Sequence, residues 1–507
     1  MKLILFFVCL LLFNAGYSQG GRAGIFGNHA DVGNPKMKGT TVYDEASQTY
    51  TIRGAGYNIW FARDEFQYAY NSVKGDFILT AQFEFTAKGV ESHRKFGWMV
   101  RESLAEDAVH MSATYHGDGL TVMQWRNGKG QNMRDPEDEI FFMKKNAQVI
   151  QLERNGKALI MRVAYLGEPL QVVGKKEMEN MPDQVLAGIF ICSHNENVIE
   201  EAKVWNVSID KPMPDNYDVY GQGFKGARLE TMNVFDGKRK VIYKSSTGFE
   251  APNWMPDGKS LIFNMGGLLY KIAAGGGEPV KVNTGTAARL NNDHGISFDG
   301  KLLAISNFKP NPAGGGGSAV YVLPLQGGEP RLVTEGTPSY FHGWSANNRD
   351  VYYVAQRDTN IYNVYKCDVN GGKEVQLTFN KSNHVDGPEG SPDGRYVYFN
   401  GSMTGTMQLW RMDPEGNNLE QLTFDENNNW FPHISPDGKW IAFISFPNDI
   451  NPDSHPAYKR VTLKLMPASG GAPKVIAYLY GGQGTINVPS WSPDSKQISF
   501  VSYKGLE

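Results

Sequence analysis

A short phrase ending in Asp-Gly recurs along the second half of the chain and constrains the fold more than any other feature. Its copies read "APNWMPDG", "EGSPDGRYVYF", "FPHISPDGKWIAF" and "VPSWSPDSKQISF". The column of the repeated Asp contains Asp257, Asp299, Asn347, Asp393, Asp437 and Asp494. Successive intervals of 42, 48, 46, 44 and 57 residues are typical of the blades of a β-propeller.

Each copy predicts the same order of strands. An apolar strand enters the tight turn, an alternating strand such as "RYVYFNG" follows, and strands such as "MQLWRMD" and "EGNNLEQLTF" complete a four-stranded blade. The last copy has only two strands, whereas the segment before the first copy supplies two strands without a blade. We therefore predict six blades in which 226–243 pairs with 486–503 and closes the ring.

The phrase "W-S-P-D-G-K-x-I-x-F" resembles the repeats of TolB-type six-bladed propellers, over nearly all of 218–507. The resemblance implies the fold but no single activity, because such repeats occur in scaffolds, in peptidase lids and in glycan lyases. The N-terminal region departs from TolB itself, which begins with a small α/β domain.

The first part of the chain has a different rhythm. Runs such as "GDFILTAQFEF", "KFGWMVRES" and "LTVMQWRNG" alternate apolar and polar residues and predict an antiparallel β-sandwich. The stretches "GWMVRESL" and "AGIFICSHNENVIEEAKVWNVSI" resemble the concanavalin-like (laminin-G-like) module, which implies a jelly-roll-like fold and association with glycans. The predicted organisation is all-β: a sandwich over 19–210, a linker over 211–217 and a propeller over 218–507.

The N-terminus predicts export. Residues 1–18 combine one Lys, a short apolar run and small residues at a cleavage point, as a secretory signal peptide does. Cys9 lies inside the apolar run and no Cys stands at the cleavage point, so a lipid anchor is not expected. We predict a periplasmic or secreted protein without a transmembrane anchor.

Composition limits the remaining classes. A net charge of −3 in 507 residues argues against a nucleic-acid partner. Cys192 and Cys367 fall in different predicted domains, which favours two buried thiols over a disulfide framework. The chain contains no "GxSxG" elbow, nucleotide loop or zinc Cys pair.

The candidate site follows from the propeller geometry, in which the first strand of each blade lines the channel. Three positions before the Ser of the turn, four blades have Pro, and two adjacent blades have His294 and His342. His433 and Glu389 occupy the next column, and Asp386 lies two positions before the Pro column. We predict that these side chains surround one mouth of the channel, and that the two adjacent histidines converge.

Two interpretations of this mouth remain open. One is a ligand site whose further lining residues are Glu250, Asn253, Asn292, Asp293, Tyr340, Trp430 and Asn487. The other is a divalent metal, such as Zn, Mn or Ca, held by His294, His342 and His433, with Glu389 or Asp386 as acid/base partner. A simpler alternative is that histidines in a wet channel only make hydrogen bonds.

Other conspicuous residues have simpler predictions. Phe66, Tyr68 and Tyr70 alternate on one face of a strand and are expected in the core, although an exposed aromatic of 56–70 could stack on a sugar ring. His384 and His455 fall outside the aligned columns and are expected at the surface.

These observations lead to one main hypothesis. We predict an exported, monomeric binding protein that recognises a carbohydrate or a protein at the channel mouth. The alternatives are a metal-assisted lyase or hydrolase of acidic oligosaccharides, and a structural partner in the envelope; whether the chain is an enzyme stays open.

Overall fold

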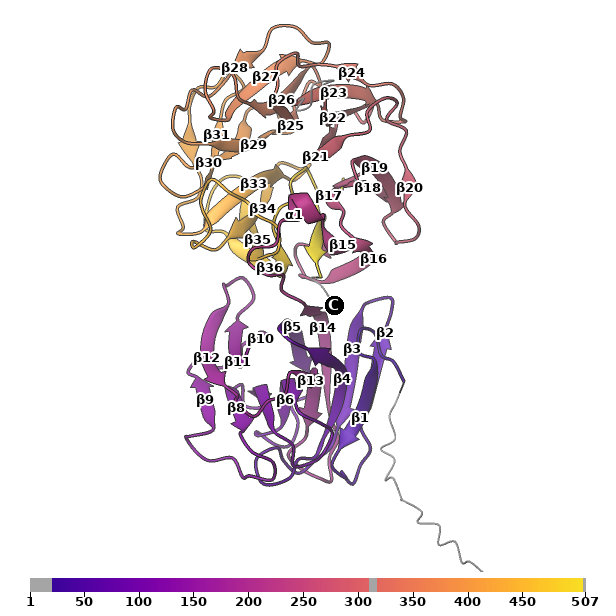
Figure 1. The fold of residues 1–507 in the computed structure, drawn as a ribbon, viewed down its shortest axis with the longest axis vertical. Coiled ribbons are helices and arrows are strands. Elements are labelled where there is room, and N and C mark those ends of the chain that lie inside the picture. The colour runs from indigo at the N-terminus through magenta and orange to yellow at the C-terminus, as the bar shows by residue number, and fades with distance from the viewer. Residues whose placement is uncertain (1–20, 310–316, 505–507) are drawn as a thin grey trace, which may run out of the picture. The chain divides into compact units, whose positions relative to one another are not determined.

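The computed structural model describes residues 21–309 and 317–504 and contains almost only β-strands (Figure 1). The predicted signal peptide, 1–18, lies outside the described residues. The chain divides into two compact units. The N-terminal unit contains the chain up to Ala164 together with Gln171–Val207, and the propeller unit contains Tyr165–Leu170 and the chain from Ser208 onward.

The N-terminal unit has two sheets of seven strands, with antiparallel pairs such as β6–β7. The first sheet has the order β1 (Asn28–Val32), β4 (Phe66–Lys74), β13 (Gln184–Cys192), β6 (Lys95–Arg101), β7 (His110–His116), β8 (Thr121–Arg126) and β9 (Glu139–Phe142). The second has the order β12 (Gln171–Glu177), β11 (Ala158–Ala164), β10 (Val149–Asn155), β5 (Phe77–Phe85), β14 (Glu200–Asp210), β3 (Thr49–Gly54) and β2 (Thr40–Asp44).

Strands β6 and β8 are buried along their whole length, on both faces. Alternation alone would leave one face of a surface sheet in water. Here the two sheets contact each other through β6 and β10, and the loop at 55–65 lies against the opposite face of the first sheet. The expected core residues Phe66, Tyr68 and Tyr70 are buried, so that prediction is confirmed.

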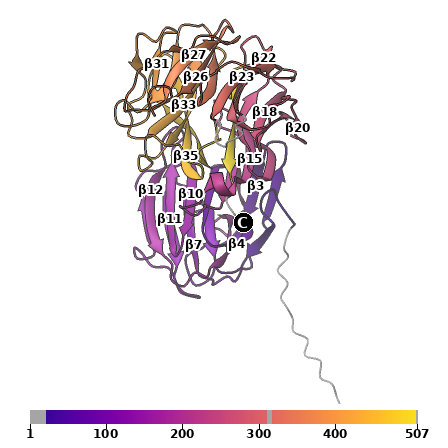
Figure 2. The same cartoon turned by 45° about the horizontal axis from the view of Figure 1, so that its top comes forward.

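The propeller unit has six blades, which follow one another around a ring from magenta to yellow in Figures 1 and 2. Five blades have four strands each. The first has β17 (Glu250–Trp254), β18 (Ser260–Met265), β19 (Leu268–Ala273) and β20 (Val280–Lys281); the second β21 (Leu290–Ile296), β22 (Leu302–Phe308), β23 (Ser318–Pro324) and β24 (Arg331–Leu332); the third β25 (Ser339–Trp344), β26 (Asp350–Ala355), β27 (Asn363–Asp368) and β28 (Val375–Gln376). The fourth has β29 (Val385–Gly390), β30 (Val397–Gly401), β31 (Gln408–Met412) and β32 (Glu420–Gln421); the fifth β33 (Asn428–Ile434), β34 (Trp440–Phe446), β35 (Lys459–Pro467) and β36 (Lys474–Gly481).

The sixth blade joins the two ends of the ring, as the sequence predicts. Its strands are β16 (Arg239–Thr247), β15 (Lys225–Asn233) and β37 (Gln497–Tyr503), and β15 pairs with β37 from Ala227 opposite Tyr503 to Asn233 opposite Gln497. The innermost segment differs from the prediction, because it forms only a bridge between Trp491 and Ile498. Pro489 and Pro493 supply no N–H group to a regular ladder there.

The repeated Ser-x-Asp of the blade phrase forms a hydrogen-bonded turn. In the fourth blade, the Ser391 hydroxyl donates to Asp393 at 2.6 Å and accepts from the backbone N–H of Tyr396 at 3.0 Å. The same two bonds recur at Ser297, Ser435 and Ser492. Gly394 follows with a φ of +72°, a conformation that glycine adopts without a Cβ penalty. The phrase therefore encodes the turn, and its repetition encodes the ring.

The apolar core of the propeller unit lies between neighbouring blades. One cluster joins Val320 and Val322 of the second blade to Phe341 and Tyr353 of the third. Corresponding clusters join the other successive pairs, from the first and second blades to the fifth and sixth. Among the described residues the only helix is α1 (Val219–Gln222), which Asp218 caps. Cys192 and Cys367 are free and buried, as expected.

Candidate functional site

The first strands of the blades are distorted at the columns that the sequence predicts to face the channel. β-Bulges interrupt the pairing in the first five blades, for example between Glu250 and Asn253 and between Asp386 and Glu389. At the bulge of the fifth blade, Phe431 has a φ of +55°. A bulge bends its strand and re-aims the side chains beside it. Side chains of neighbouring columns therefore point in different directions in this channel.

His342 is the central residue of the mouth. Its Nε2 lies 2.8 Å from Asp386 Oδ1 of the fourth blade, and its ring stacks on Phe431 of the fifth with centroids 6.0 Å apart. The charge of Asp293 in the second blade and the backbone of Asn487 in the sixth also act on its pKa. Groups from four other blades thus surround His342, which places it near the axis of the ring.

His342 and Asp386 form an ion pair. Burial disfavours the charged imidazole, but the carboxylates of Asp386 and Asp293 outweigh it and raise the pKa of His342. Burial would raise the pKa of Asp386, yet the nearby imidazolium lowers it. Both shifts favour the charged pair at neutral pH. Nδ1 of His342 makes no hydrogen bond of good geometry to the described residues, although the backbone of Asn487 also acts on the imidazole.

His455 is a partly exposed loop residue, as expected, but it also belongs to the mouth, which the sequence analysis did not predict. It lies in the connection between β34 and β35, with Nε2 3.8 Å from Asp386 Oδ2. Its ring centroid lies 4.5 Å from that of Trp430 and 5.2 Å from that of Phe431. Sequence reasoning missed it because it stands outside the aligned columns. The only signal was the long interval of 57 residues in this part of the repeat.

Two further carboxyl groups share the mouth. Burial raises the pKa of Glu250 to about 8, and the charge of Asp293 adds to the increase. Burial raises the pKa of Asp293 to about 6, and His342 and Asp386 act on it in opposite directions. Asn292 donates to Glu250 at 3.3 Å, which links the first and second blades. The unusual Asp in "NNDHG" is therefore the residue of that phrase that faces His342.

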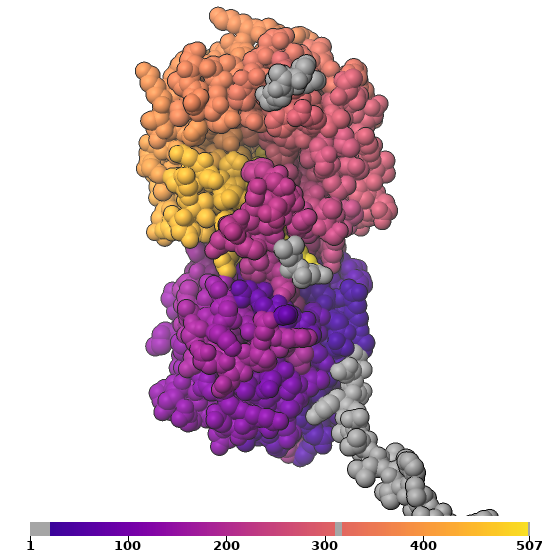
Figure 3. All heavy atoms as spheres, in the orientation of Figure 1, coloured from indigo at the N-terminus to yellow at the C-terminus, as the bar shows by residue number. Residues whose placement is uncertain are grey.

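The short helix α1 covers part of this region. Its Tyr220 is 83% exposed and lies within range of the charges of Glu250 and Asp293. Figure 3 shows magenta atoms of this segment over the centre of the propeller face, between the yellow C-terminal strands and the red blades. The mouth thus has an aromatic rim beside its acidic centre.

His433 and Glu389 belong to a second group of residues, whose hydrogen bonds link neighbouring blades. His433 Nδ1 lies 2.7 Å from Glu389 Oε2, and its Nε2 lies 2.6 Å from the carbonyl oxygen of Ile486. Glu389 also accepts from the backbone N–H of Ile434 at 3.0 Å. Both ring nitrogens of His433 are therefore occupied by bonds that tie the fourth, fifth and sixth blades together.

His294 does not join His342. Its Nδ1 lies 2.9 Å from the carbonyl oxygen of Asn292 in its own strand, and burial lowers its pKa to about 4. In the described part of the chain, no hydrogen bond or ring contact links the two imidazoles. The expected convergence of adjacent histidines is not what the structure shows; the partner of His342 is an aspartate of the next blade.

Of the remaining predicted residues, one lies at the mouth and others link blades or hold a loop. Tyr340 lies at the mouth, within range of the charges of Asp293 and Asp386. Asn253 donates to the Pro489 carbonyl oxygen at 2.5 Å and links the first and sixth blades. Asn487 holds its own loop by accepting from the N–H of Gly484 at 2.9 Å.

The three histidines of the metal hypothesis do not come together in the described structure. Over residues 21–309 and 317–504, no group of three or more His, Cys, Asp or Glu side chains is placed to hold a metal ion. His294, His342 and His433 each have a different partner. No helix formed by the same residues is long and apolar enough to cross a membrane.

Comparison with known proteins agrees with the ring. A family model for the TolB β-propeller domain matches residues 314–466. Uncharacterized protein Atu1656 of Agrobacterium fabrum is 43% identical over 286 residues, which are 56% of this chain and 95% of that protein. The chain belongs to the TolB-like β-propeller family.

One solved structure places the TolB-like similarity in a little over half of the chain. A TolB candidate from Agrobacterium tumefaciens has 43% identity and a TM-score of 0.52, and the match covers 55% of this chain and 99% of that one. TolB from Acinetobacter baumannii has 13% identity and a TM-score of 0.40, over 66% and 79% of the two chains.

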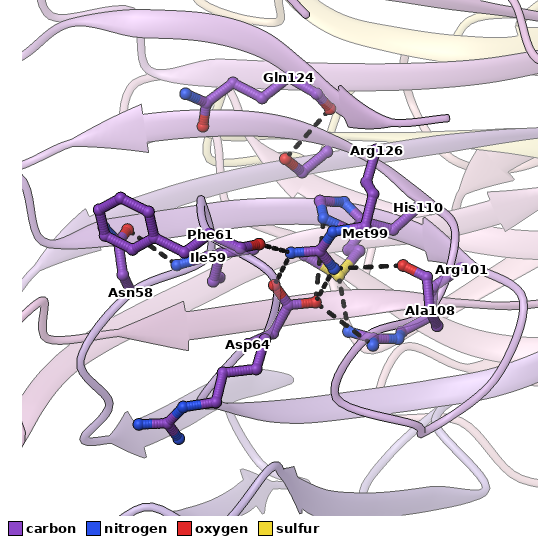
Figure 4. A network of polar contacts seen from close by, with 12 residues as sticks. Asn58, Ile59, Phe61, Asp64, Met99, Arg101, Ala108, His110, Gln124 and Arg126 are labelled. Carbon is purple, nitrogen blue, oxygen red and sulfur yellow. Dashed lines mark hydrogen bonds and ion pairs between the residues drawn. The ribbon is translucent and has the colours of Figure 1, made fainter. Parts of the chain in front are cut away.

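Outside the TolB-like propeller, a polar network that sequence analysis missed lies in the N-terminal unit (Figure 4). Arg126 binds Asp64 through two contacts of 2.7 and 2.8 Å, and Arg101 Nη2 lies 3.5 Å from the same carboxylate. His110 Nε2 is 3.9 Å from Asp64, and burial, then the two arginines, hold its pKa well below its usual range. All four side chains have no exposed surface. Alternating strand positions gave no sign that Arg101 and Arg126 would be buried.

Proposed function

We propose that this protein is an exported binding protein whose TolB-like propeller takes up a ligand at the channel mouth. The observation that carries the proposal is the position of His342, which is surrounded by groups from four other blades and forms a 2.8 Å ion pair with Asp386. The Asp386 side chain is 21% exposed and the His455 side chain 25%, so the pair borders solvent. Partly exposed titratable groups with shifted pKa values are typical of binding sites.

The charge of the mouth favours a ligand that donates hydrogen bonds. The groups that shift the pKa values of Glu250, Asp293 and Asp386 are acids, His and amides, with no Lys or Arg among them. Carboxylates accept hydrogen bonds, so sugar hydroxyls or the ammonium group of a protein partner suit this mouth. An acidic oligosaccharide would meet like charges, which argues against the predicted lyase substrate.

The finer organisation belongs to the same proposal. We infer that 1–18 directs export to the periplasm or beyond, and that 19–210 forms a concanavalin-like sandwich joined through 211–217 to the propeller at 218–507. Two seven-stranded sheets and the resemblance of their sequence support the sandwich. We expect the protein to act as a monomer.

Calorimetric titration of the full-length protein tests the mouth. The probes are neutral cello- and laminari-oligosaccharides, a Lys-rich peptide and trigalacturonate. We expect a neutral or cationic probe to bind, and His342→Ala and Asp386→Asn each to weaken binding at least tenfold. Glu335→Gln removes an exposed carboxylate elsewhere on the propeller and should leave the affinity unchanged. Binding of trigalacturonate alone, or equal affinity in the His342 variant, would contradict the proposal.

A further inference from the structure

The loop between β3 and β4 presents a stack of side chains at the surface of the N-terminal unit. The rings of Tyr57 and Phe61 are nearly parallel, with an interplanar angle of 13° and centroids 6.4 Å apart. The guanidinium carbon of Arg63 lies 4.2 Å from the centroid of the Tyr57 ring. Phe61 remains 52% exposed, although Phe66 shortly after it is completely buried. The loop therefore offers an aromatic surface to solvent.

The charge of this stack is balanced within the loop. The Arg63 side chain pairs with Glu65 at 2.5 Å, and the Tyr57 hydroxyl donates to the Arg63 carbonyl oxygen at 2.6 Å. Tyr57 and Phe61 carry no charge at neutral pH. With its partner Glu65 counted, the stack, defined as Tyr57, Phe61 and Arg63, has no net charge, and it presents aromatic rings with a guanidinium group that lies over Tyr57.

The backbone below the stack is held at several points. The Phe61 carbonyl oxygen accepts from Arg126 Nη2 at 2.5 Å, and the Trp60 carbonyl oxygen accepts from the N–H of Met133 at 3.0 Å. The N–H of Asp64 donates to the carbonyl oxygen of Glu106 at 2.7 Å. Figure 4 shows the Phe61 ring pointing away from the bond between its carbonyl oxygen and Arg126. The backbone that carries the ring is therefore fixed before any ligand arrives.

The bonds that hold the loop belong to the buried network of Asp64. Ion pairs without exposed surface carry a large desolvation cost, and apolar residues of similar volume are often at least as stabilising. Apolar residues could not bind the Phe61 and Ala108 carbonyl groups, as Arg126 does. What the network supplies is a defined loop conformation, a property that binding sites require of their supporting residues.

From these observations we propose that the stack is a binding platform for the pyranose rings of a neutral polysaccharide. It lies in the N-terminal unit and does not depend on the propeller mouth. The apolar C–H face of a pyranose lies flat on an aromatic ring, and its hydroxyl groups extend sideways to polar neighbours. Arg63 is placed to donate to them. Because Glu65 balances Arg63, an anionic polymer gains little there, and a neutral sugar is the ligand that the charge of the stack fits.

Affinity electrophoresis of the full-length protein tests this site. Native gels contain laminarin, xyloglucan or pullulan as neutral polymers, and polygalacturonate as the acidic one. We expect at least one neutral polymer to retard the protein, and Phe61→Ala and Tyr57→Ala to raise its dissociation constant at least tenfold. Phe61→Trp, which keeps a ring, should bind as well as the natural protein.

Two controls make the outcome decisive. Phe141→Ala removes another exposed phenylalanine, 44% exposed on β9, and should leave retardation unchanged. Retardation that His342→Ala lowers and Phe61→Ala leaves unchanged comes from the mouth, so that failure of the mouth and failure of the stack are distinguishable. Retardation only by polygalacturonate, equal retardation of Phe61→Ala, or no retardation by any neutral polymer would each overturn the proposal.

Discussion

The molecule contains two networks of charged side chains that differ in how far they are open to solvent. In the N-terminal unit, the carboxylate of Asp64 meets two guanidinium groups, and none of the three side chains has exposed surface. At the propeller mouth, Asp386 meets two imidazoles and remains 21% exposed, and two further carboxyl groups lie nearby. The first arrangement is closed to water, and the second is open to it.

The difference is useful because buried charges alone do not identify a site. In the Asp64 network, the arginine side chains donate to loop carbonyl oxygens such as those of Ser103 and Phe61. The mouth contains Glu250, whose raised pKa of about 8 favours the neutral acid, and an Asp386 carboxylate that remains partly exposed. We infer that the closed network stabilises conformation and the open one is available to a ligand.

Breaking the closed network should have the largest effect on stability. Asp64→Ala leaves two buried guanidinium groups without their carboxylate, which typically costs about 3–5 kcal/mol. We expect the unfolding transition of the N-terminal unit to shift by that amount in urea denaturation. Asp183→Ala, at a pair 3.8 Å from Lys74 with a 62% exposed carboxylate, should change stability by less than about 0.5 kcal/mol. An equal loss of stability in the two variants would contradict the claim that the closed network stabilises the N-terminal unit more than an exposed ion pair does.

A pH titration of stability should separate the networks next. The folded pKa of Glu250, about 8, lies above its ordinary value of 4.5, so its stabilising contribution is complete below pH 4.5 and is lost as the pH rises through 8. We expect the propeller unit to lose on the order of 4 kcal/mol between pH 5 and 9. Glu250→Gln should flatten this slope in denaturation measured at each pH.

The groups around Glu250 define how to interpret that slope. Asp293, with a raised pKa of about 6, adds a smaller decrease of the same sign at lower pH, and Tyr220 and Tyr503 lie within range of the Glu250 charge. Burial, then the charges of the two arginines, hold the pKa of His110 below its ordinary value of 6.5, so this residue adds a slope of the opposite sign, in which stability of the N-terminal unit is lost as the pH falls below 6.5. An unchanged slope in Glu250→Gln would exclude this residue as its source.

Opening the mouth pair should affect stability less than removing Asp64. Asp386→Asn keeps the shape of the side chain and removes a charge that borders solvent, so we expect a loss of about 1 kcal/mol. The same change should weaken ligand binding at least tenfold, as measured by calorimetry. A loss of stability as large as that of Asp64→Ala would instead indicate that Asp386 serves to stabilise the fold.

The smallest effect on stability is expected at the surface stack. Phe61→Ala removes a half-exposed ring and should change the free energy of unfolding by less than about 0.5 kcal/mol. Phe66→Ala, five residues along the chain and fully buried, should cost about 3–5 kcal/mol. Thermal unfolding of the two variants distinguishes a ring kept for binding from a ring kept for packing.

Much of the fold could be predicted from the sequence because the repeat acts locally. The Ser391–Asp393 turn is made by side chains two residues apart, so its pattern is visible in the letters themselves. The pairing of β15 with β37 followed from counting strands. Both inferences needed only short-range chemistry and the requirement that the ring close.

The site was less predictable because its contacts cross between blades. Asp386 and His342 were both expected at the mouth, but their pairing depends on bulges that turn neighbouring columns in different directions. His455 enters from a connection that no repeat aligns. Similarly, Asp64 binds Arg126 across 62 positions of sequence, and the alternation of apolar and polar residues in strands does not predict such a contact.

The pairing of β15 with β37 has a consequence for biosynthesis. Translation delivers the strands in order, so the blade that seals the ring cannot form until Gln497–Tyr503 has left the ribosome. The N-terminal unit is complete at Val207 and can fold much earlier. During synthesis, the nascent protein would therefore contain a folded N-terminal unit followed by an open ring of blades, in which the edge of β15 is still unpaired. That interval is when a chaperone would be most useful.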